Sequence, residues 1–245
     1  ARAAGADIET EDQRPGYKRV AIKFTGKLRA DQKKALRDLA VHDMGVLVAP
    51  PGSGKTVIAC ALVAKRKLPA LILVHRKQLA DQWKQRLLKF TDLAKKQIGV
   101  YDSKGVRRKG IVDIGMLQTL AREKEADKIL SDYGLVIVDE CHHVPAVSFE
   151  PVLKRIVARY YFGLTATPYR KDGLEKIIHM QCGPVVHTMA EGRAQLTLDR
   201  TAIIRETSFR VEGQESTQPA IHEIWQQMVS DEQRTGLVVS DILAA

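Results

Sequence analysis

The sequence has few cysteines and few aromatic residues, and it contains no long apolar run. Its three cysteines, Cys60, Cys141 and Cys182, are far apart and form no Cys-x-x-Cys pair, so neither a disulfide framework nor a zinc site is indicated. No apolar stretch approaches the roughly 20 residues that a membrane-spanning helix needs. Residues 1–7 lack the apolar core of a secretory signal peptide. We therefore expect a cytoplasmic protein without a membrane partner.

Acidic residues are the scarcer charge: 39 Lys and Arg stand against 29 Asp and Glu, which gives a net charge of +10 over 245 residues. A basic balance of this size is compatible with a polyanionic partner. A solvated basic surface explains it equally well, so composition leaves both interpretations open. Because 44% of the residues are hydrophobic, the chain can build a sizeable core, as one large α/β domain or as two small ones.

Short apolar runs alternate with helix-like segments along the chain. Ala70–Val74 and Leu135–Val138 are apolar throughout, as strands covered on both faces are. Residues 78–90 place apolar side chains at helical spacing, and residues 20–24 alternate as a half-buried strand does. The alternation predicts an α/β fold, in which helices cover both faces of a parallel sheet. In such sheets ligands collect at the carboxyl ends of the strands, so functional residues should directly follow strands.

The stretch Ala49–Thr56, APPGSGKT, has the layout of a phosphate-binding P-loop between a strand and a helix. Gly52 and Gly54 allow the backbone to bend so that successive N–H groups point at an anion. Lys55 can reach the β- and γ-phosphates, and the Thr56 hydroxyl can ligate Mg²⁺. The usual first glycine of the pattern is Ala49 here, and the alternative is an ordinary glycine-rich turn. The predicted phosphate-binding residues are Pro51, Gly52, Ser53, Gly54, Lys55 and Thr56.

An acidic pair, Asp139 and Glu140, directly follows the apolar run that ends at Val138. Carboxylates at the end of a buried strand are unfavourable unless something binds them. In a P-loop enzyme the first carboxylate holds Mg²⁺ and the second orients and deprotonates the attacking water. We therefore predict Asp139 as a metal ligand with Thr56, and Glu140 and Lys55 as catalytic residues. The alternative is a pair that caps the next turn.

Two hydroxyl residues, Thr165 and Thr167, flank a small residue and precede Pro168. This arrangement fits a turn that hydrogen-bonds to the acidic pair, but taken alone an ordinary strand-ending turn is the simpler interpretation. The neighbouring segment Cys141–His143 could suggest zinc, which is disfavoured because adjacent residues cannot easily converge on one ion.

In this order, APPGSGKT, the DECH tetrapeptide at residues 139–142 and LTATP at residues 164–168 resemble motifs I, II and III of the superfamily 2 helicases. Leu28–Gln32, Val74–Trp83 and Asp113–Leu120 resemble the glutamine motif, motif Ia and motif Ib. The residues after motif III are similar to those of the XPB-like DNA helicases, and closer still to their bacterial relatives. This chain has Arg170-Lys171-Asp172 where the XPB branch has Arg-Glu-Asp.

The resemblance implies a RecA-like domain that binds ATP and Mg²⁺. The glutamine of the glutamine motif reads the adenine edge in this family, which implies Gln32, with Arg29 beside it, as ATP-binding residues. The coupling of hydrolysis to motion is expected from His142, Thr165 and Thr167. In this superfamily motifs Ia and Ib touch the phosphates of one nucleic-acid strand. The resemblance favours DNA over RNA, as one strand of a duplex, but the sequence does not decide between the two. The implied contacts are His75, Arg76, Gln118 and Thr119.

The resemblance also divides the chain. Residues 1–26 are expected to form a tail and flanking strand, residues 27–190 the first RecA-like domain, and residues 191–245 flanking strands, a helix and a linker. The arginine-finger motif of a second RecA-like domain, Gln-x-x-Gly-Arg-x-x-Arg, has no match in residues 191–245. Without that finger, hydrolysis is expected to fall roughly 10³-fold or more. We expect the ATP-binding half of a nucleic-acid-dependent ATPase or helicase, whose second RecA-like domain belongs to the same protein.

Other functions stay open at this point. A translocating subunit of a restriction or defence system would use the same motor for another task. A scaffold that binds nucleotide without hydrolysing it would also keep the P-loop. A P-loop kinase or a transporter ATPase would not need the Thr-Ala-Thr-Pro turn or the Gln32 region.

Overall fold

The computed structural model describes residues 16–102, 105–107, 111–143, 150–167, 175–190, 204–211 and 220–244. The chain divides into two compact units, Ala1–Arg193 and Ala194–Ala245. The first unit holds the sheet and every residue predicted to bind nucleotide or nucleic acid.

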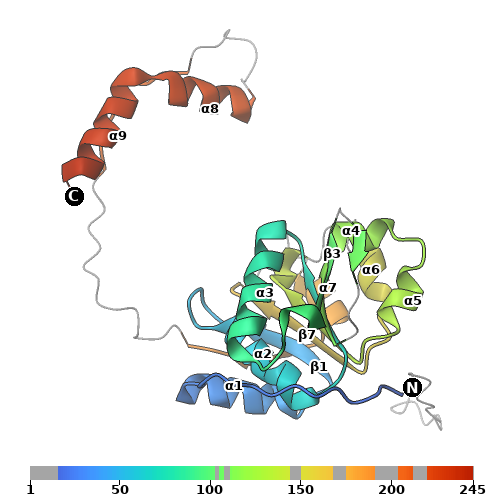
Figure 1. The fold of residues 1–245 in the computed structure, drawn as a ribbon. Coiled ribbons are helices and arrows are strands. Elements are labelled where there is room, and N and C mark those ends of the chain that lie inside the picture. Colours follow the sequence, from blue (N-terminus) through green and yellow to red (C-terminus); the bar gives the residue numbers. More distant parts are fainter. Residues whose placement is uncertain are drawn as a thin grey trace, which may run out of the picture. The chain divides into compact units, whose positions relative to one another are not determined.

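An eight-stranded sheet with the order β4-β3-β5-β2-β6-β7-β1-β8 forms the centre of the first unit. Neighbouring strands are parallel except for β3 and β4, which pair antiparallel. Helices lie on both faces (Figure 1), so the expected fold class is confirmed. The strands are β1 Met44–Val48, β2 Ala70–Val74, β3 Ile98–Asp102, β4 Gly105–Arg107, β5 Val112–Met116, β6 Leu135–Asp139, β7 Tyr160–Thr165 and β8 Val185–Thr188.

The helices of this unit connect the strands as in other parallel sheets. They are α1 Ala30–Ala40, α2 Lys55–Arg66, α3 Lys77–Phe90, α4 Leu117–Arg122, α5 Ala126–Leu130, α6 Glu150–Lys154 and α7 Glu175–Cys182, with short 3-10 helices η2 Lys95–Gln97 and η3 Cys141–His143. The sequence patterns did not predict α4, α7, β4 or β8.

Alternate side chains of the central strands point into two separate cores. In β2, Ile72 and Val74 pack with α1, α2 and α3, whereas Leu71 and Leu73 pack with the helices α4 to α7 on the other face. Because successive side chains of a strand face opposite sides, a strand buried on both faces must be apolar throughout. Each such side chain contributes about 1.5–3 kcal/mol when it is fully buried. The two cores fix the strand ends that carry the candidate site.

The segment before α1 is not the strand that the alternation at residues 20–24 predicted. Among the described residues, it pairs only through one isolated bridge, between Phe24 and Thr91. The Val20 N–H donates to the carbonyl of Lys67 at the end of α2, at 3.0 Å. Ile22 is buried in the core of α1, α2 and α3. A period of two shows which side chains face the core, but it does not show whether a neighbouring strand is within reach.

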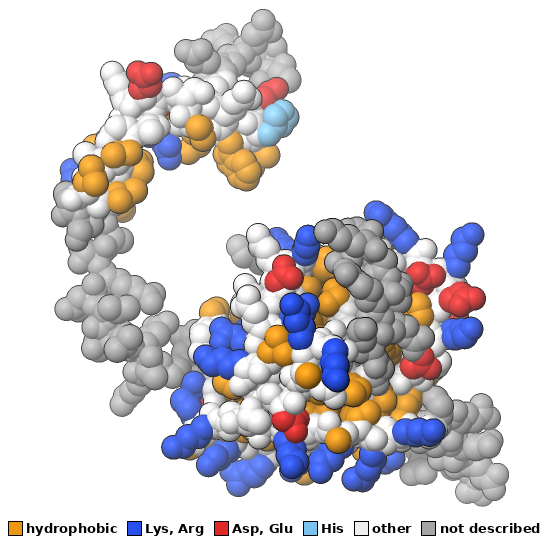
Figure 2. Space-filling view, in the orientation of Figure 1, with side chains coloured by type: hydrophobic (Ala, Val, Ile, Leu, Met, Phe, Trp, Pro, Cys, Tyr) orange, Lys and Arg blue, Asp and Glu red, His pale blue; other side chains and the backbone are white. Residues whose placement is uncertain are grey.

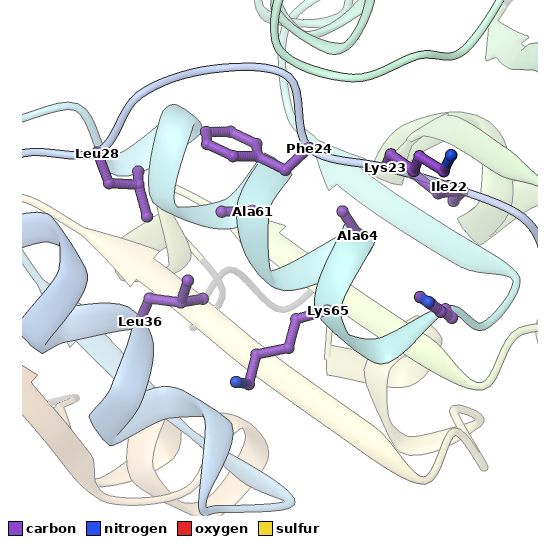
Figure 3. A pocket seen from close by; sticks show the side chains of 9 residues that line it. Ile22, Lys23, Phe24, Leu28, Leu36, Ala61, Ala64 and Lys65 are labelled. Carbon is purple, nitrogen blue, oxygen red and sulfur yellow. The ribbon is translucent and has the colours of Figure 1, made fainter.

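A cavity of about 390 Å³ lies where this N-terminal segment meets α1 and α2 (Figure 3). Phe24, Leu36 and Ala61 give it an apolar lining, to which Lys23 and Lys65 also contribute. None of the residues predicted to bind nucleotide lines it. The cavity is therefore separate from the phosphate-binding turn.

Basic side chains are prominent on α1, where Lys33, Lys34 and Arg37 are exposed. In Figure 2 Lys and Arg side chains gather on the part of the first unit where Figure 1 draws α1. This helix packs against α2 and β8, at the end of the sheet away from β5. The net positive charge of the chain is therefore not, by itself, an argument for nucleic-acid contacts at β5 or β2.

In the described part of the second unit there are two helices, α8 Ile221–Ser230 and α9 Glu232–Ala244, whereas residues 204–211 have no regular structure. Apolar patterns at residues 196–198 and 202–204 predicted strands; residues 196–203 lie outside the described part, and Ile204 has no regular structure. Several apolar side chains of the two helices are exposed (Figure 2). Trp225 is among them, with 63% of its surface exposed. None of the helices that the structure describes has the length and apolar character needed to cross a membrane.

Candidate nucleotide site

The predicted site residues lie at the carboxyl ends of five neighbouring strands. Gln118 and Thr119 follow β5, His75 and Arg76 follow β2, and the acidic pair Asp139 and Glu140 lies at the end of β6. Thr165 ends β7, and the P-loop follows β1. All five strands are parallel, so their carboxyl ends meet at one edge of the sheet. The residues expected to contact nucleic acid are thus on one side of the acidic pair, and the P-loop is on the other.

The P-loop turns between β1 and α2 through two glycines with left-handed backbone angles, Gly52 at φ +76° and Gly54 at φ +89°. Gly54 caps α2, whose first residue is Lys55. The Lys55 ammonium donates to the carbonyl of Ala49 at 2.9 Å and lies 3.9 Å from Oε1 of Glu140. The turn therefore places a cation and the helix N-terminus next to the end of β6.

Gln32 and Arg29 hold the P-loop from α1. The Gln32 amide and the Arg29 guanidinium both donate to the carbonyl of Ser53, at 2.9 and 2.8 Å. The Gln32 carbonyl accepts from the backbone N–H of Arg29 at 3.0 Å. Gln32 is buried, so its polar groups need these partners. The glutamine predicted to read adenine thus lies against the phosphate-binding turn.

Asp139 is held by two donors at the end of β6. The indole N–H of Trp83, in α3, donates to Oδ2 of Asp139 at 2.7 Å, and the backbone N–H of Glu140 donates to Oδ1 at 3.0 Å. The sequence pattern placed Trp83 among the apolar side chains of residues 78–90, and the resemblance placed it at the end of motif Ia, but neither indicated this contact. The signal that could have identified this contact is the indole itself, because a buried Trp N–H needs an acceptor.

Burial raises the pKa of Asp139 above its ordinary value, and the neighbouring charge of Glu140 raises it further. The Trp83 hydrogen bond and the Lys55 charge oppose this rise. Lys55 is the positively charged side chain that lowers the pKa of this carboxylate. A divalent cation would stabilise the ionised form there.

Glu140 has φ +49°, which is uncommon for a residue other than glycine. Such backbone angles occur preferentially at functional sites, where the surrounding structure maintains them. Its Oε2 atom is buried and makes no hydrogen bond to any described residue, although Nδ1 of His142 lies 3.3 Å away. The carboxylate is therefore available for a further donor, such as a water molecule.

His142, Thr165 and Thr167 form a connected network between β6 and β7. Nδ1 of His142 lies 3.0 Å from Oγ1 of Thr165. The Thr165 hydroxyl donates to the carbonyl of Thr167 at 2.9 Å and accepts from the Thr167 N–H at 3.1 Å. Since the Thr165 proton is engaged with Thr167, Nδ1 of His142 must be the donor. The three residues predicted to couple hydrolysis to motion are brought together.

The residues predicted to contact nucleic acid are also adjacent. The side-chain amide of Gln118 donates to the carbonyl of His75 at 2.8 Å, which joins the ends of β5 and β2. Arg76 is exposed and caps α3, and Thr119 is half-buried. The hydrogen bond to His75 therefore occupies one N–H of the Gln118 amide, whereas the exposed Arg76 side chain can contact a phosphate from solvent.

The residues present fit a nucleotide phosphate with Mg²⁺. Two polar atoms of the site, Ser53 Oγ and Glu140 Oε2, are buried without a hydrogen bond to any described residue. Buried polar atoms in native proteins are almost always paired, so these two indicate a ligand or an ordered water. The Thr56 hydroxyl and the Asp139 carboxylate supply the oxygen ligands that Mg²⁺ prefers.

Residues 25–170 match the family model ResIII, described as "Type III restriction enzyme, res subunit". The chain belongs to this family. Curated relatives confirm that this ResIII chain resembles the superfamily 2 helicases of the XPB-like branch, as expected.

A putative ATP-dependent RNA helicase of Acanthamoeba polyphaga mimivirus is 36% identical over 168 residues, which are 67% of this chain and 32% of that protein. The putative DNA 3'-5' helicase Rad25 of Halobacterium salinarum is 38% identical over 149 residues, which are 59% of this chain and 24% of that protein. The DNA 3'-5' helicase XPB of Kineococcus radiotolerans is 35% identical over 162 residues, with 64% and 29% covered. The ResIII chain thus spans a third or less of each of these relatives.

Solved structures show the same fold. The SWI2/SNF2 ATPase core of Sulfolobus solfataricus, in complex with dsDNA, superposes with a TM-score of 0.56 at 19% identity, over 68% of this chain and 37% of that one. The UvsW helicase of bacteriophage T4 superposes with a TM-score of 0.54 at 18% identity, over 65% and 59%. At such low identity these matches establish the RecA-like helicase fold alone.

Proposed function

We propose that this chain is the ATP-binding half of a DNA-dependent ATPase that couples hydrolysis to translocation or unwinding. The observation that supports it best is the meeting of three strand ends: the P-loop Lys55 lies 3.9 Å from Glu140, and His142 connects the acidic pair to Thr165. A phosphate-binding cation, an acidic pair and a hydroxyl network are what phosphoryl transfer to water needs in one place.

Mg²⁺·ATP, when bound, supplies the γ-phosphoryl group as the electrophile. Lys55 and the backbone N–H groups of the P-loop neutralise the phosphate oxygens, and Thr56 with Asp139 would hold the metal. Glu140, whose Oε2 makes no hydrogen bond to any described residue, holds the attacking water and accepts its proton. Gln32 and Arg29 fix the turn through the Ser53 carbonyl, so we assign them to positioning the P-loop as well as to ATP.

We propose that His142 transmits movements of Glu140 at the phosphate site to the end of β7. Its ring lies between the Glu140 carboxylate, at 3.3 Å, and the Thr165 hydroxyl, at 3.0 Å. A change in the position of Glu140 during hydrolysis would therefore alter the turn that contains Thr165 and Thr167. Such a turn is suited to transmit motion because it follows a buried strand directly.

DNA is the proposed polymer, contacted by His75, Arg76, Gln118 and Thr119. Two relatives described above carry DNA helicase names, and one solved neighbour is bound to dsDNA; the mimivirus relative is named for RNA. Contacts of this kind are to phosphates and are independent of sequence. A second RecA-like domain, supplying the arginine finger, is proposed as the partner of the site.

A translocating subunit of a restriction system is the second candidate. The family description itself names a restriction enzyme, and one structural neighbour is the Type ISP restriction-modification enzyme LlaBIII bound to DNA, with a TM-score of 0.53 at 19% identity. Both candidates use the same ATP site. They differ in whether the two DNA strands are separated. With the full-length protein, a helicase should unwind a duplex, whereas a translocating subunit should displace the third strand of a triplex without unwinding the duplex.

The ATP site is tested by calorimetric titration of the chain with ATP in Mg²⁺ and in EDTA. Lys55→Ala is expected to weaken binding about 10- to 100-fold, because a hydrogen bond to a charged group contributes about 1.5–3 kcal/mol. Lys33→Ala, an exposed lysine of α1, is the matched control and should bind as the wild type does. Equal affinities for all three proteins would contradict the site.

Turnover separates the remaining alternatives. The full-length protein should hydrolyse ATP faster with DNA than with RNA, whereas this chain alone should show little turnover. Stimulation by RNA alone would contradict the choice of DNA. Strong nucleic-acid-stimulated turnover by the chain alone would contradict its assignment as half of a motor. ATP binding without turnover in the full-length protein would favour the scaffold.

A further inference from the structure

One buried hydrogen bond joins α3 to the acidic pair. Trp83 is 1% exposed and Asp139 is 8% exposed. The indole nitrogen of Trp83 lies 2.7 Å from Oδ2 of Asp139. The two residues are 56 positions apart in the sequence. Because both are buried, neither can exchange this partner for bulk water, so the bond fixes the position of the carboxylate.

The donors that Asp139 uses determine which oxygen lone pairs remain for a metal. Oδ2 accepts from Trp83 and Oδ1 accepts from the Glu140 N–H. A carboxylate has about four acceptor positions, so one on each oxygen remains for another ligand. With one donor on each oxygen the carboxylate plane is fixed. Outer partners of this kind orient metal ligands, and their loss typically lowers metal affinity about 10- to 100-fold.

The helix that carries Trp83 begins at the residues predicted to touch nucleic acid. α3 starts at Lys77 and is capped by Arg76, and the preceding His75 carbonyl is held by Gln118. Trp83 is seven residues after Arg76, which is two turns or about 10 Å along a helix. A helix moves as a stiff element, so a displacement of its first turn is carried to the indole.

We propose that Trp83 is a positioning residue that links the nucleic-acid edge to the metal-binding carboxylate. Occupation of Arg76 by a phosphate would set the position of α3, and the Trp83 N–H would thereby set the orientation of Asp139. Nucleic acid and Mg²⁺·ATP then strengthen each other's binding, since coupling between two sites is reciprocal. This inference rests on the proposed function of the site.

The first test uses the wild-type chain and needs no turnover. The chain has two tryptophans, Trp83 and Trp225, so its ¹⁵N-labelled indole spectrum has two resonances, and Trp225→Phe assigns them. We expect the Trp83 resonance to shift with Mg²⁺·ATP, to shift less with ATP in EDTA, and to shift again when a single-stranded oligonucleotide is added. A Trp83 resonance that is unchanged by Mg²⁺·ATP at saturation would overturn the inference.

The second test is Trp83→Phe, which keeps an aromatic ring but removes the N–H. The ratio of ATP affinities in Mg²⁺ and EDTA should fall about 10-fold, while the affinity in EDTA stays near that of the wild type. The gain in ATP affinity caused by the oligonucleotide should fall as well. Leu87→Ala is the matched control, because Leu87 is buried on the same helix and contacts no site residue by a hydrogen bond.

The outcomes separate this inference from the proposed function. If the wild type fails to bind Mg²⁺·ATP, both are wrong. If it binds, and Trp83→Phe keeps both the Mg²⁺ ratio and the oligonucleotide effect, only the role of Trp83 is wrong. Equal losses in Trp83→Phe and Leu87→Ala would mean that general destabilisation explains the effect, and would also overturn it. Should Trp83→Phe not fold, the indole spectrum of the wild type decides.

Discussion

Gly54 lies directly against the side chain of Gln32. A Cβ atom added to Gly54 would be 2.4 Å from Nε2 of Gln32, and the φ angle of Gly54 is +89°. The same Gln32 amide donates to the neighbouring carbonyl of Ser53 at 2.9 Å. The glycine is therefore required twice, for its backbone angle and for the space that the glutamine occupies.

Gly54→Ala should accordingly destabilise the protein more than Gly52→Ala. Both glycines have positive φ, but nothing lies within 4 Å of a Cβ built on Gly52. Backbone strain alone is expected to lower the free energy of unfolding by about 1–3 kcal/mol, and displacement of Gln32 adds to this at Gly54. Urea denaturation of the two variants measures the difference. Equal losses would mean that Gln32 moves aside freely.

Arg76→Ala should weaken the binding of single-stranded DNA without affecting ATP binding in EDTA. Arg76 is exposed at the start of α3 and is not part of the P-loop contacts. Loss of one phosphate contact should make the slope of log affinity against log salt shallower by about 0.7. Fluorescence anisotropy at several salt concentrations measures it. Lys34→Ala, on the exposed face of α1, is the control with the same charge change; equal effects would indicate non-specific attraction.

The contribution of Mg²⁺ to ATP binding should be lost on acidification at a higher pH than for an ordinary aspartate. Burial raises the pKa of Asp139, and a metal binds the ionised carboxylate, so protonation below this raised pKa competes with the metal. Titrations between pH 4 and 8, compared with titrations in EDTA, isolate the metal-dependent part. A metal contribution that stays constant down to the ordinary pKa of Asp, about 4, would contradict the expected direction.

The cysteines should resist alkylation in the native state. All three are buried, and burial raises the pKa of Cys60 to about 12. The pKa of Cys141 also lies well above its usual value, with its contact to Cys182 as the largest cause and burial next. At pH 8 a thiol with a pKa near 12 is only about 10⁻⁴ ionised, so its reaction with iodoacetamide is slow. Mass spectrometry should show complete labelling only in denaturant; rapid native labelling would show that the core opens.

The fold class could be predicted because its signals are local and repeated. The runs at Ala70–Val74 and Leu135–Val138 are apolar at every position, as a strand between two covered faces requires, and their shortness favours strands over buried helices. The spacing of Gly52, Gly54 and Lys55 likewise predicts a tight turn between a strand and a helix. Both signals depend only on residues that are close together in the sequence, so they can be read without knowing the fold.

The contacts that join distant segments could not be predicted in the same way. Trp83 satisfied the apolar pattern of its helix, and nothing in that pattern indicates that its N–H meets Asp139. Gln32 was assigned to adenine by resemblance, and the contact to the Ser53 carbonyl appears only when α1 lies beside the P-loop. The error at residues 20–24 has the same origin, since strand pairing depends on a partner elsewhere in the chain.

The two edge strands of the sheet also affect how the chain behaves at high concentration. One edge strand is β8, which has four residues and a shifted register against β1. Nδ1 of His187 in this strand lies 2.7 Å from Oδ2 of Asp38 in α1. The other is the three-residue β4, which pairs antiparallel to its neighbour. Short, irregular borders expose few unpaired backbone groups to another molecule. Edge-to-edge association of sheets from separate molecules is thereby disfavoured, and any self-association should depend instead on exposed apolar side chains such as Trp225.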